Sequence, residues 1–386
     1  MLQKYWYDTR VRAGVVQVAL LLLFFGGLGW LGINTRDNLT RQGMNIDFGF
    51  FHQASRFPIS ETLVSYSPAD TFGRAFLVGL LNTLMVASIV ICLSTVLGFL
   101  LMLARRSKHP LVSGVAQAYI EIIRNTPLIV HLMFWYMVVI TTLPNVRNAL
   151  EPLPFVFLSV RGIFAPSIFI SGTAQSLPWA SAVALLLIIT AVMLRSLRRR
   201  TDRVPAWISR PQLIIVAVAI FGAFWILDGL TLSADLPQLR GLNYRGGISL
   251  TPEFSALVVA LVSYKVAFIA EIYRGGIDAV SRGQWEAGRA VGLKDRDTLR
   301  LVVLPQALRI IVPPMASMYL TAVKNTTIAL AIGYPDLSAV VSTAINQSGR
   351  ALEGFGVMIA VYLCISLAVA SFMNWYNRRV SLVVAK

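Results

Sequence analysis

The chain has 386 residues with a mean hydropathy of +0.68, and only 13% of its residues are charged. Soluble domains carry about 25% charged residues, so this composition indicates an integral membrane protein. The net charge of +16 does not indicate a nucleic-acid partner, because the basic residues are scattered between apolar runs. Cys92 and Cys364 lie in separate apolar runs and there are only three histidines, so we expect neither a disulfide nor a metal site.

The predicted membrane spans follow from the length of the apolar runs. A bilayer core needs about 20 apolar residues per helix, so the sequence predicts an all-α integral membrane protein with about eight transmembrane helices. In chain order the expected helices are 15–33, 75–104, 120–143, 179–197, 212–230, 254–273, 304–323 and 354–376. The first follows a basic N-terminus, as a signal peptide does. It is nevertheless long enough to span a bilayer, and no A-x-A cleavage site follows it, so we expect it to be retained.

The orientation follows from Lys and Arg in the connections, which are more frequent on the cytoplasmic side. With the N-terminus inside, the inner connections hold basic clusters at 105–108 and in "LRSLRRRTDR" (194–203), whereas the outer ones hold fewer. We therefore expect a multi-pass protein of the bacterial inner membrane with both termini in the cytoplasm. The outer segments 34–72 and 144–178 contain Pro, Gly, Ser and Phe, and we expect partial helices on the membrane surface there.

A long charged connection spans 281–309 and reads "SRGQWEAGRAVGLKDRDTLRLVVLPQALR". Ser281 followed by Gln284 fits a capping box, which predicts a short helix at 282–291. Gly292 then occupies the position where a helix end favours a left-handed residue. This connection is predicted to lie in the cytoplasm.

A second short helix follows in the same connection. Asp295 or Asp297 is positioned to cap it, and it leads to Leu304 and Pro305. Because proline lacks an N–H and clashes with the preceding turn, we expect the helix to bend or restart at Pro305. The predicted result is a compact helix–turn–helix against the inner face of the membrane.

The first of these short helices carries small side chains at Ala287, Gly288 and Ala290. Small residues let another surface approach closely, and Glu286 and Arg289 add polar groups to that surface. An ordinary cytoplasmic connection would rarely combine this length, two helix ends, a small face and a final Leu-Pro. We therefore expect the hairpin to receive a partner.

The stretch "EAGRAVGLKDRDTLRLVVLP" resembles the EAA loop of ABC importer permeases: E-A-A, three residues, Gly, nine residues, Ile, one residue and Leu-Pro. Gly288 replaces the second Ala, and Val302 replaces the Ile. The resemblance implies a coupling helix that fits a cleft in a separate cytoplasmic ATPase. The implied coupling residues are Glu286, Ala287, Gly288, Arg289, Gly292, Leu304 and Pro305.

Further segments resemble permeases of the polar amino acid uptake family: "GLLNTLMVAS" (79–88), "IIRNTPLIVHLMFWY" (122–136), "AEIYRGGI" (270–277) and "AVKNTTIALAIGYPDL" (322–337). That family usually has Gln at the position of His131, so no shared role is assumed there. "ISETLVSYSPADTFGRAFLVGLLNTL" (59–84) resembles the Q-type permease of general L-amino acid importers.

The resemblance implies a type I importer permease core of five helices at 75–143 and 254–386. It also implies an N-terminal helix and periplasmic segment at 1–74, and an insert at 144–253 with two extra helices. The implied partners are a related permease subunit in a heterodimer, an ATPase dimer, a periplasmic amino-acid-binding protein and an L-amino acid substrate. No G-x-x-x-x-G-K-[ST] phosphate loop is present. We thus expect a transport subunit without a cofactor, whose partner ATPase uses ATP and Mg.

Polar residues within membrane spans tend to face a cavity or a partner, because charge is costly there. They give three groups of candidates for the substrate path: Asn82 and Thr83; Arg124, Asn125 and Thr126; Lys324, Asn325, Thr326 and Thr327. Other roles are open for each group, such as hydrogen bonds between helices or a snorkelling Arg124. Glu271 is expected to pair with Arg274.

Three other functions fit less well. An ion-coupled secondary transporter would need carboxylates near the membrane midplane, often in inverted repeats, but Asp and Glu are nearly absent from the predicted helix centres and no repeat is found. An intramembrane enzyme would need a reactive constellation, and His131 has no evident partner in the sequence. An inert scaffold would not need the charged hairpin. The sequence therefore predicts an ABC importer permease for L-amino acids.

Overall fold

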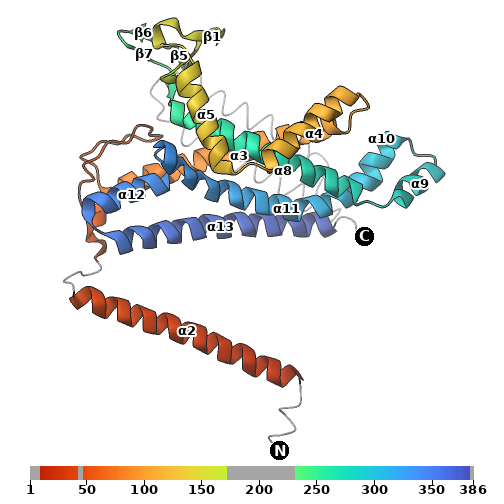
Figure 1. Ribbon diagram of the computed structural model, residues 1–386, viewed down its shortest axis with the longest axis horizontal. Helices are drawn as coiled ribbons and strands as arrows, with labels where there is room; N and C mark the ends of the chain where they lie inside the picture. The colour runs from red at the N-terminus through yellow and green to blue at the C-terminus, as the bar shows by residue number, and fades with distance from the viewer. Residues whose placement is uncertain (1–8, 42–46, 172–230, 383–386) are drawn as a thin grey trace, which may run out of the picture.

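The computed structural model describes residues 9–41, 47–171 and 231–382, and long helices dominate it (Figure 1). Among these residues, five helices are long and apolar enough to cross a membrane, or six if one bent pair counts as a single span. The predicted helical membrane architecture is confirmed in this part of the chain, although the expected all-α fold is wrong in detail, because small sheets are also present. The predicted helices 179–197 and 212–230 lie outside the described residues.

The first helix, α2 (Thr9–Arg41), contains the predicted span 15–33 and lies apart from the other helices (Figure 1). None of its apolar window is buried inside the described chain. Leu22, Leu23 and Phe25 are examples of its exposed apolar side chains. A helix that is apolar all round and packs on no protein is suited to lipid, where its backbone hydrogen bonds are satisfied internally.

The helices α3 (Phe72–Arg105) and α8 (Pro252–Asp278) form the centre of the molecule and pack along each other. Their backbones come close at Gly98, where an added Cβ would lie 2.6 Å from Cγ2 of Ile269. Small residues permit such close helix packing in membranes, where the hydrophobic effect does not drive helices together. The buried residues of this contact include Val86, Val90, Leu257 and Leu261.

The predicted single helix 120–143 is wrong. The chain forms two helices, α4 (Pro110–Arg124) and α5 (Leu128–Thr142), whose axes differ by 109°. Pro127 explains the break, because proline has no N–H to donate and disfavours a helical conformation of the residue before it. Each piece has 15 residues, which is too short to cross a bilayer alone.

The last third of the chain contains a second break. Helix α11 (Leu304–Asn325) ends in a 3-10 helix, η4 (Thr326–Ile332), and the chain then turns through Gly333 at φ +80°. The short helix α12 (Leu337–Ser348) follows and packs against α3, and α13 (Ala351–Leu382) then runs back beside α11 (Figure 1). We refer to residues 326–336 as the broken segment.

The outer segments differ from the expected partial helices. Residues 47–71 contain only the 3-10 helix η1 (Phe48–His52), and 144–171 contain the 3-10 helix η2 (Val146–Asn148) followed by strands. The strands are β1 (Leu150–Leu153), β2 (Val156–Ser159), β3 (Gly162–Ala165), β4 (Ser167–Ser171), β5 (Thr231–Asp235), β6 (Gln238–Arg240), β7 (Asn243–Arg245) and β8 (Ile248–Leu250).

These strands form small antiparallel sheets that join the two described ends of the predicted insert. One sheet has the order β1-β2-β3-β8, and two further pairs are β4-β5 and β6-β7. Gly162, at φ +122°, begins β3, where an added Cβ would lie 2.0 Å from the carbonyl oxygen of Leu250. Only glycine fits this close approach of β3 to β8, so the register of that pair depends on it.

Candidate coupling hairpin and transport path

The first helix of the charged hairpin is α9 (Arg282–Ala290), close to the predicted 282–291. Gly292 has φ +81°, and its N–H donates to the Arg289 carbonyl at 2.9 Å. The N–H of Leu293 donates to the Gly288 carbonyl at 3.0 Å. This pair of bonds is the Schellman arrangement, so the predicted left-handed helix end at Gly292 is confirmed.

The predicted capping box at the start of α9 is wrong. The Ser281 side chain makes no capping hydrogen bond. Gln284 Oε1 accepts a hydrogen bond of 2.9 Å from Gln306 Nε2 on α11. The glutamine therefore ties α9 to the following membrane helix, a long-range partner that a local sequence pattern does not reveal.

The second short helix, α10 (Asp295–Thr298), also begins without the expected aspartate cap. Its first residue, Asp295, accepts a hydrogen bond of 2.9 Å from Nε of Arg289 at Oδ1. This ion pair links the two short helices on the exposed surface of the hairpin. Such exposed pairs are worth roughly 0–1 kcal/mol, so it orients the turn more than it stabilises it.

The α-helix restarts at the Leu-Pro pair, as expected: α11 begins at Leu304 with Pro305 in its first turn, directly after a change in helix type. A π-helical turn, η3 (Leu299–Val303), joins α10 to α11, and the Leu304 N–H donates to the Leu299 carbonyl. The wider turn takes up one extra residue just before Pro305, which itself cannot donate. Helical structure therefore continues from Asp295 to Ile332, a run of 38 residues.

Part of the predicted small face of α9 is covered within the chain itself. Gly288 is buried, and a Cβ added there would lie 2.5 Å from Cγ2 of Thr298, which is itself fully buried. The surface that approaches Gly288 in this structure is thus the second helix of its own hairpin. The residues of α9 and its end that remain exposed are Arg282, Gly283, Glu286, Ala287, Arg289, Ala290, Val291 and Gly292.

Charged residues gather where the hairpin meets the membrane helices. Glu271 on α8 accepts a hydrogen bond of 2.9 Å from Nη2 of Arg274, which confirms that predicted pair. Its carboxylate also pairs with Arg105 and lies 3.8 Å from Nη1 of Arg124. The Arg124 guanidinium lies over the Phe268 ring at 5.5 Å from the centroid. Arg124 is therefore held in a charge cluster at this end of α8.

The other two candidates of the Arg124 group lie in the bend between α4 and α5. Asn125 is the C-terminal cap of α4 and is exposed. The Thr126 hydroxyl donates to the Ile122 carbonyl at 2.8 Å. The Thr126 N–H donates to the Ile123 carbonyl at 3.3 Å, so the hydroxyl satisfies the Ile122 carbonyl that this N–H would otherwise bond.

Asn82 and Thr83 are fully buried on α3 and connect it to the broken segment. Asn82 Nδ2 donates to the carbonyls of Glu61 and Pro335, both at 2.9 Å. The Thr83 hydroxyl accepts a hydrogen bond of 3.0 Å from the Leu337 N–H. Both side chains therefore hold the start of α12 against α3.

The Lys324 group surrounds the start of the broken segment. Lys324 is exposed, whereas Thr326 is fully buried and donates to the Val323 carbonyl at 2.9 Å. The Thr327 hydroxyl donates to the Lys324 carbonyl at 2.8 Å, and Asn325 is the last residue of α11. The structure thus brings the Asn82–Thr83 pair and the Lys324 group to the two ends of one segment, while the Arg124 group lies in a different region.

Comparison with known proteins decides what kind of molecule carries these features. Residues 204–382 match the family described as the binding-protein-dependent transport system inner membrane component. The putative amino-acid ABC transporter permease protein YhdX of Escherichia coli K12 is 42% identical over 381 residues, which cover 97% of this chain and 96% of that protein. This chain belongs to the family of amino-acid ABC transporter permeases.

Two further relatives of this permease match along nearly the whole chain. The general L-amino acid transport system permease protein AapQ of Rhizobium johnstonii is 38% identical, covering 98% of this chain and 94% of that protein. The glutamate/glutamine/aspartate/asparagine transport system permease protein BztB of Rhodobacter capsulatus is 36% identical, covering 97% and 95%. The predicted family is thereby confirmed. The chain is a multi-pass inner-membrane transport subunit, and ATP hydrolysis belongs to a separate ATPase.

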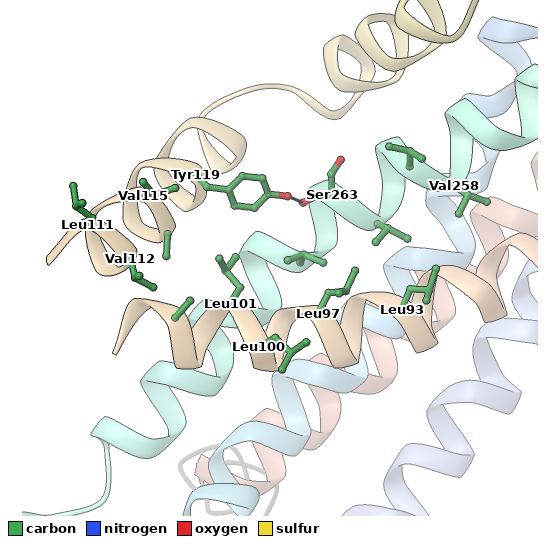
Figure 2. A pocket seen from close by; sticks show the side chains of 15 residues that line it. Leu93, Leu97, Leu100, Leu101, Leu111, Val112, Val115, Tyr119, Val258 and Ser263 are labelled. Atoms are coloured by element: carbon green, nitrogen blue, oxygen red, sulfur yellow. Dashed lines mark hydrogen bonds between the residues drawn. The ribbon is translucent and has the colours of Figure 1, made fainter. Parts of the chain in front are cut away.

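A large apolar groove between α3, α4 and α8 of the permease does not fit a polar ligand (Figure 2). Its walls include Leu97, Leu101 and Val115. The Tyr119 hydroxyl in this groove already donates a hydrogen bond of 2.8 Å to the Ser263 carbonyl. A zwitterion leaving water would find few partners for either charge there.

Two of the buried ionisable residues that the sequence reasoning missed are Lys265 and Glu61. Lys265 lies on α8 with 3% of its surface exposed, and its signal was visible as a lone charge within "LVSYKVAF" (261–268). Glu61, in the outer segment, is 8% exposed and accepts a hydrogen bond of 2.6 Å from the Thr251 N–H. Burial raises the pKa of Glu61. No sequence signal marked Glu61, because its partner is 190 residues away.

Proposed function

We propose that this permease moves L-amino acids from the periplasm into the cytoplasm by alternating access, as one of two related permease subunits in a heterodimer. An ATPase dimer would drive the change by moving the hairpin. The observation that supports this most is the hairpin itself, which is closed by internal contacts and still exposes one face of α9. The names of the relatives YhdX and AapQ support the amino-acid substrate.

The hairpin is built to transmit movement to the broken segment. Gly288 packs on Thr298, and Gln284 is bonded to Gln306, so α9 is joined to α10 and α11 at two points. The helical run that begins at Asp295 ends at Ile332, inside the broken segment. At about 1.5 Å per residue this run is roughly 55 Å long, enough to connect the cytoplasm with the outer half of the bilayer.

The substrate path would pass the broken segment, where irregular backbone can line a cavity. In this proposal the Asn82–Thr83 pair and the Lys324–Thr327 group act near the outer mouth, and the Arg124–Thr126 group acts near the inner mouth. A periplasmic binding protein would deliver substrate to the outer face. Both termini lie in the cytoplasm, the core is 75–143 with 254–386, and 1–74 and 144–253 are additions. The chain binds no cofactor, and ATP with Mg serves the ATPase.

The test is uptake by the complete complex in proteoliposomes, with labelled L-amino acids, the binding protein outside and ATP inside. We expect uptake only when ATP and binding protein are both present. An ion-coupled secondary transporter would instead accumulate substrate with an ion gradient and without ATP. That outcome would refute the proposal.

A further inference from the structure

A lysine lies at the midpoint of the permease's central helix. Lys265 is thirteen residues from Pro252 and thirteen from Asp278, the two ends of α8. It is only 3% exposed, so its side chain points into the helix bundle and not toward lipid. Ionisable residues at such depth are costly and commonly mark a substrate or ion path.

The partners of this lysine are neutral. Nζ donates to the Thr321 hydroxyl at 2.6 Å and to the Met318 carbonyl at 3.4 Å, both on α11. None of the ion pairs found between described residues includes Lys265. An ammonium group has three N–H donors, and a buried charge without a counter-charge is unfavourable. Among the described residues, no acidic side chain therefore neutralises this ammonium.

Thr321, the hydroxyl partner of Lys265, lies close to the break in α11. The broken segment begins five residues later, at Thr326. An ammonium and a hydroxyl can both donate to a carboxylate, so the contact between α8 and α11 offers donors of the kind that a carboxylate needs.

We propose that Lys265 binds a carboxylate of the substrate as it crosses the middle of the membrane. This inference rests on the proposed amino-acid transport. In the present conformation Thr321 and Met318 hold the ammonium in place. When α8 and α11 separate during transport, the carboxylate takes over their role and neutralises the buried charge. The carboxylate is either the α-carboxylate of every amino acid or the side-chain carboxylate of an acidic one.

The experiment measures uptake of labelled L-glutamate, L-glutamine and L-leucine by the complete complex in proteoliposomes, with Lys265→Met beside wild type. Methionine keeps the length and packing of the side chain and removes its charge. We expect at least a tenfold rise in KM or an equivalent loss of uptake. A loss for all three substrates indicates the α-carboxylate, and a loss for glutamate alone indicates the side-chain carboxylate. Uptake of all three within twofold of wild type would overturn the proposal.

The variant Thr321→Val separates a purely structural role of Lys265 from carboxylate binding. It removes the hydroxyl partner of Lys265 and keeps the branched shape of the side chain. If Lys265 only joined α8 to α11, both variants would lower the thermal stability of the complex equally and would leave the KM values of all three substrates unchanged. A lysine that binds the carboxylate instead raises KM in Lys265→Met and not in Thr321→Val.

If Lys265→Met does not assemble, Lys265→Gln decides. It keeps a donor for the Thr321 hydroxyl and removes the positive charge, so wild-type KM values and selectivity there would refute carboxylate binding. If wild type itself transports no amino acid, the proposed function fails instead.

Discussion

The charged hairpin (residues 281–309) and the broken segment lie at opposite ends of one helical run. The contacts that stabilise them differ in kind. In the hairpin the decisive contacts are local, such as Gly288 with Thr298 and Arg289 with Asp295. The broken segment is held by distant parts of the chain, because the residues of the Asn82–Pro335 pair are 253 positions apart. A unit closed by local contacts can move as a body, whereas one held by distant helices changes only when those helices move.

The largest effect is expected from adding a side chain at Gly288, where α9 contacts α10. Gly288→Val would place methyl groups where even a Cβ lies 2.5 Å from Thr298, so α9 should separate from α10. We expect normal amounts of permease in the membrane, loss of ATPase co-purification and at least a tenfold loss of uptake. Adding Thr298→Ala should restore part of both. Equal loss with and without Thr298→Ala would show that the contact is not what limits coupling.

The exposed face of α9 should matter next. Glu286→Lys reverses a charge on that face without changing any contact shown within the permease, so we expect about a tenfold weaker ATPase association and loss of stimulation by loaded binding protein. Lys108→Glu, an exposed charge reversal in another predicted cytoplasmic connection, is the matched control and should keep both. ATP hydrolysis by the reconstituted complex gives the answer. Similar behaviour of the two variants would remove α9 from the docking surface.

Substitutions at the broken segment should change the thermal stability of the complex and leave ATPase association unchanged. Asn82→Leu leaves the carbonyls of Glu61 and Pro335 without their donor, which we expect to cost roughly 2–5 kcal/mol. The purified complex should therefore melt at a lower temperature while its ATPase remains bound. A melting curve that matches wild type would mean that water replaces both hydrogen bonds.

The smallest expected effect concerns pH. Burial raises the pKa of Asp336, the N-terminal cap of α12, from its usual 3.8 to about 6. The folded protein thus holds this proton more tightly than the unfolded chain. The stability that it contributes is full below about pH 4 and is lost as the pH rises through about 6.

Asp336→Asn keeps a capping side chain and cannot ionise, so it should flatten the melting temperature between pH 4 and 7 by the equivalent of about 1–2 kcal/mol. Melting of the complex across this range measures the effect. An unchanged slope would assign the pH dependence to other groups.

The same division explains what could be predicted from the sequence. Spans such as α3 and α8 follow from apolar length, and the turn at Gly292 follows from a local pattern, so both were predicted correctly. The bend at Pro127 was missed although the proline was visible, because the apolar run continues through it. The roles of Gln284 and Asn82 depend on partners far along the chain, which no local pattern contains.

The strands of the insert were missed for a similar reason. The stretch 156–165 is short, and its pairing with β8 crosses the part of the chain from 172 to 230. Lys265 was different, since a single charge at the centre of an apolar run is a signal in itself. The candidates of the Arg124 group and the Lys324 group remain predictions about the path, and the structure gives them hydrogen-bonded or surface positions.

The π-helical turn at Leu299–Val303 also sets the rotation of α10 around the helix axis relative to α11. One residue of an α-helix corresponds to a rotation of about 100° around the axis. The number of residues between Gly292 and Pro305 therefore sets which side of the α11 axis α9 faces. This direction does not depend on the chemistry of the α9 side chains. If α9 docks on an ATPase as proposed, deleting one residue from this turn would leave every side chain of α9 present and turn them away from that ATPase.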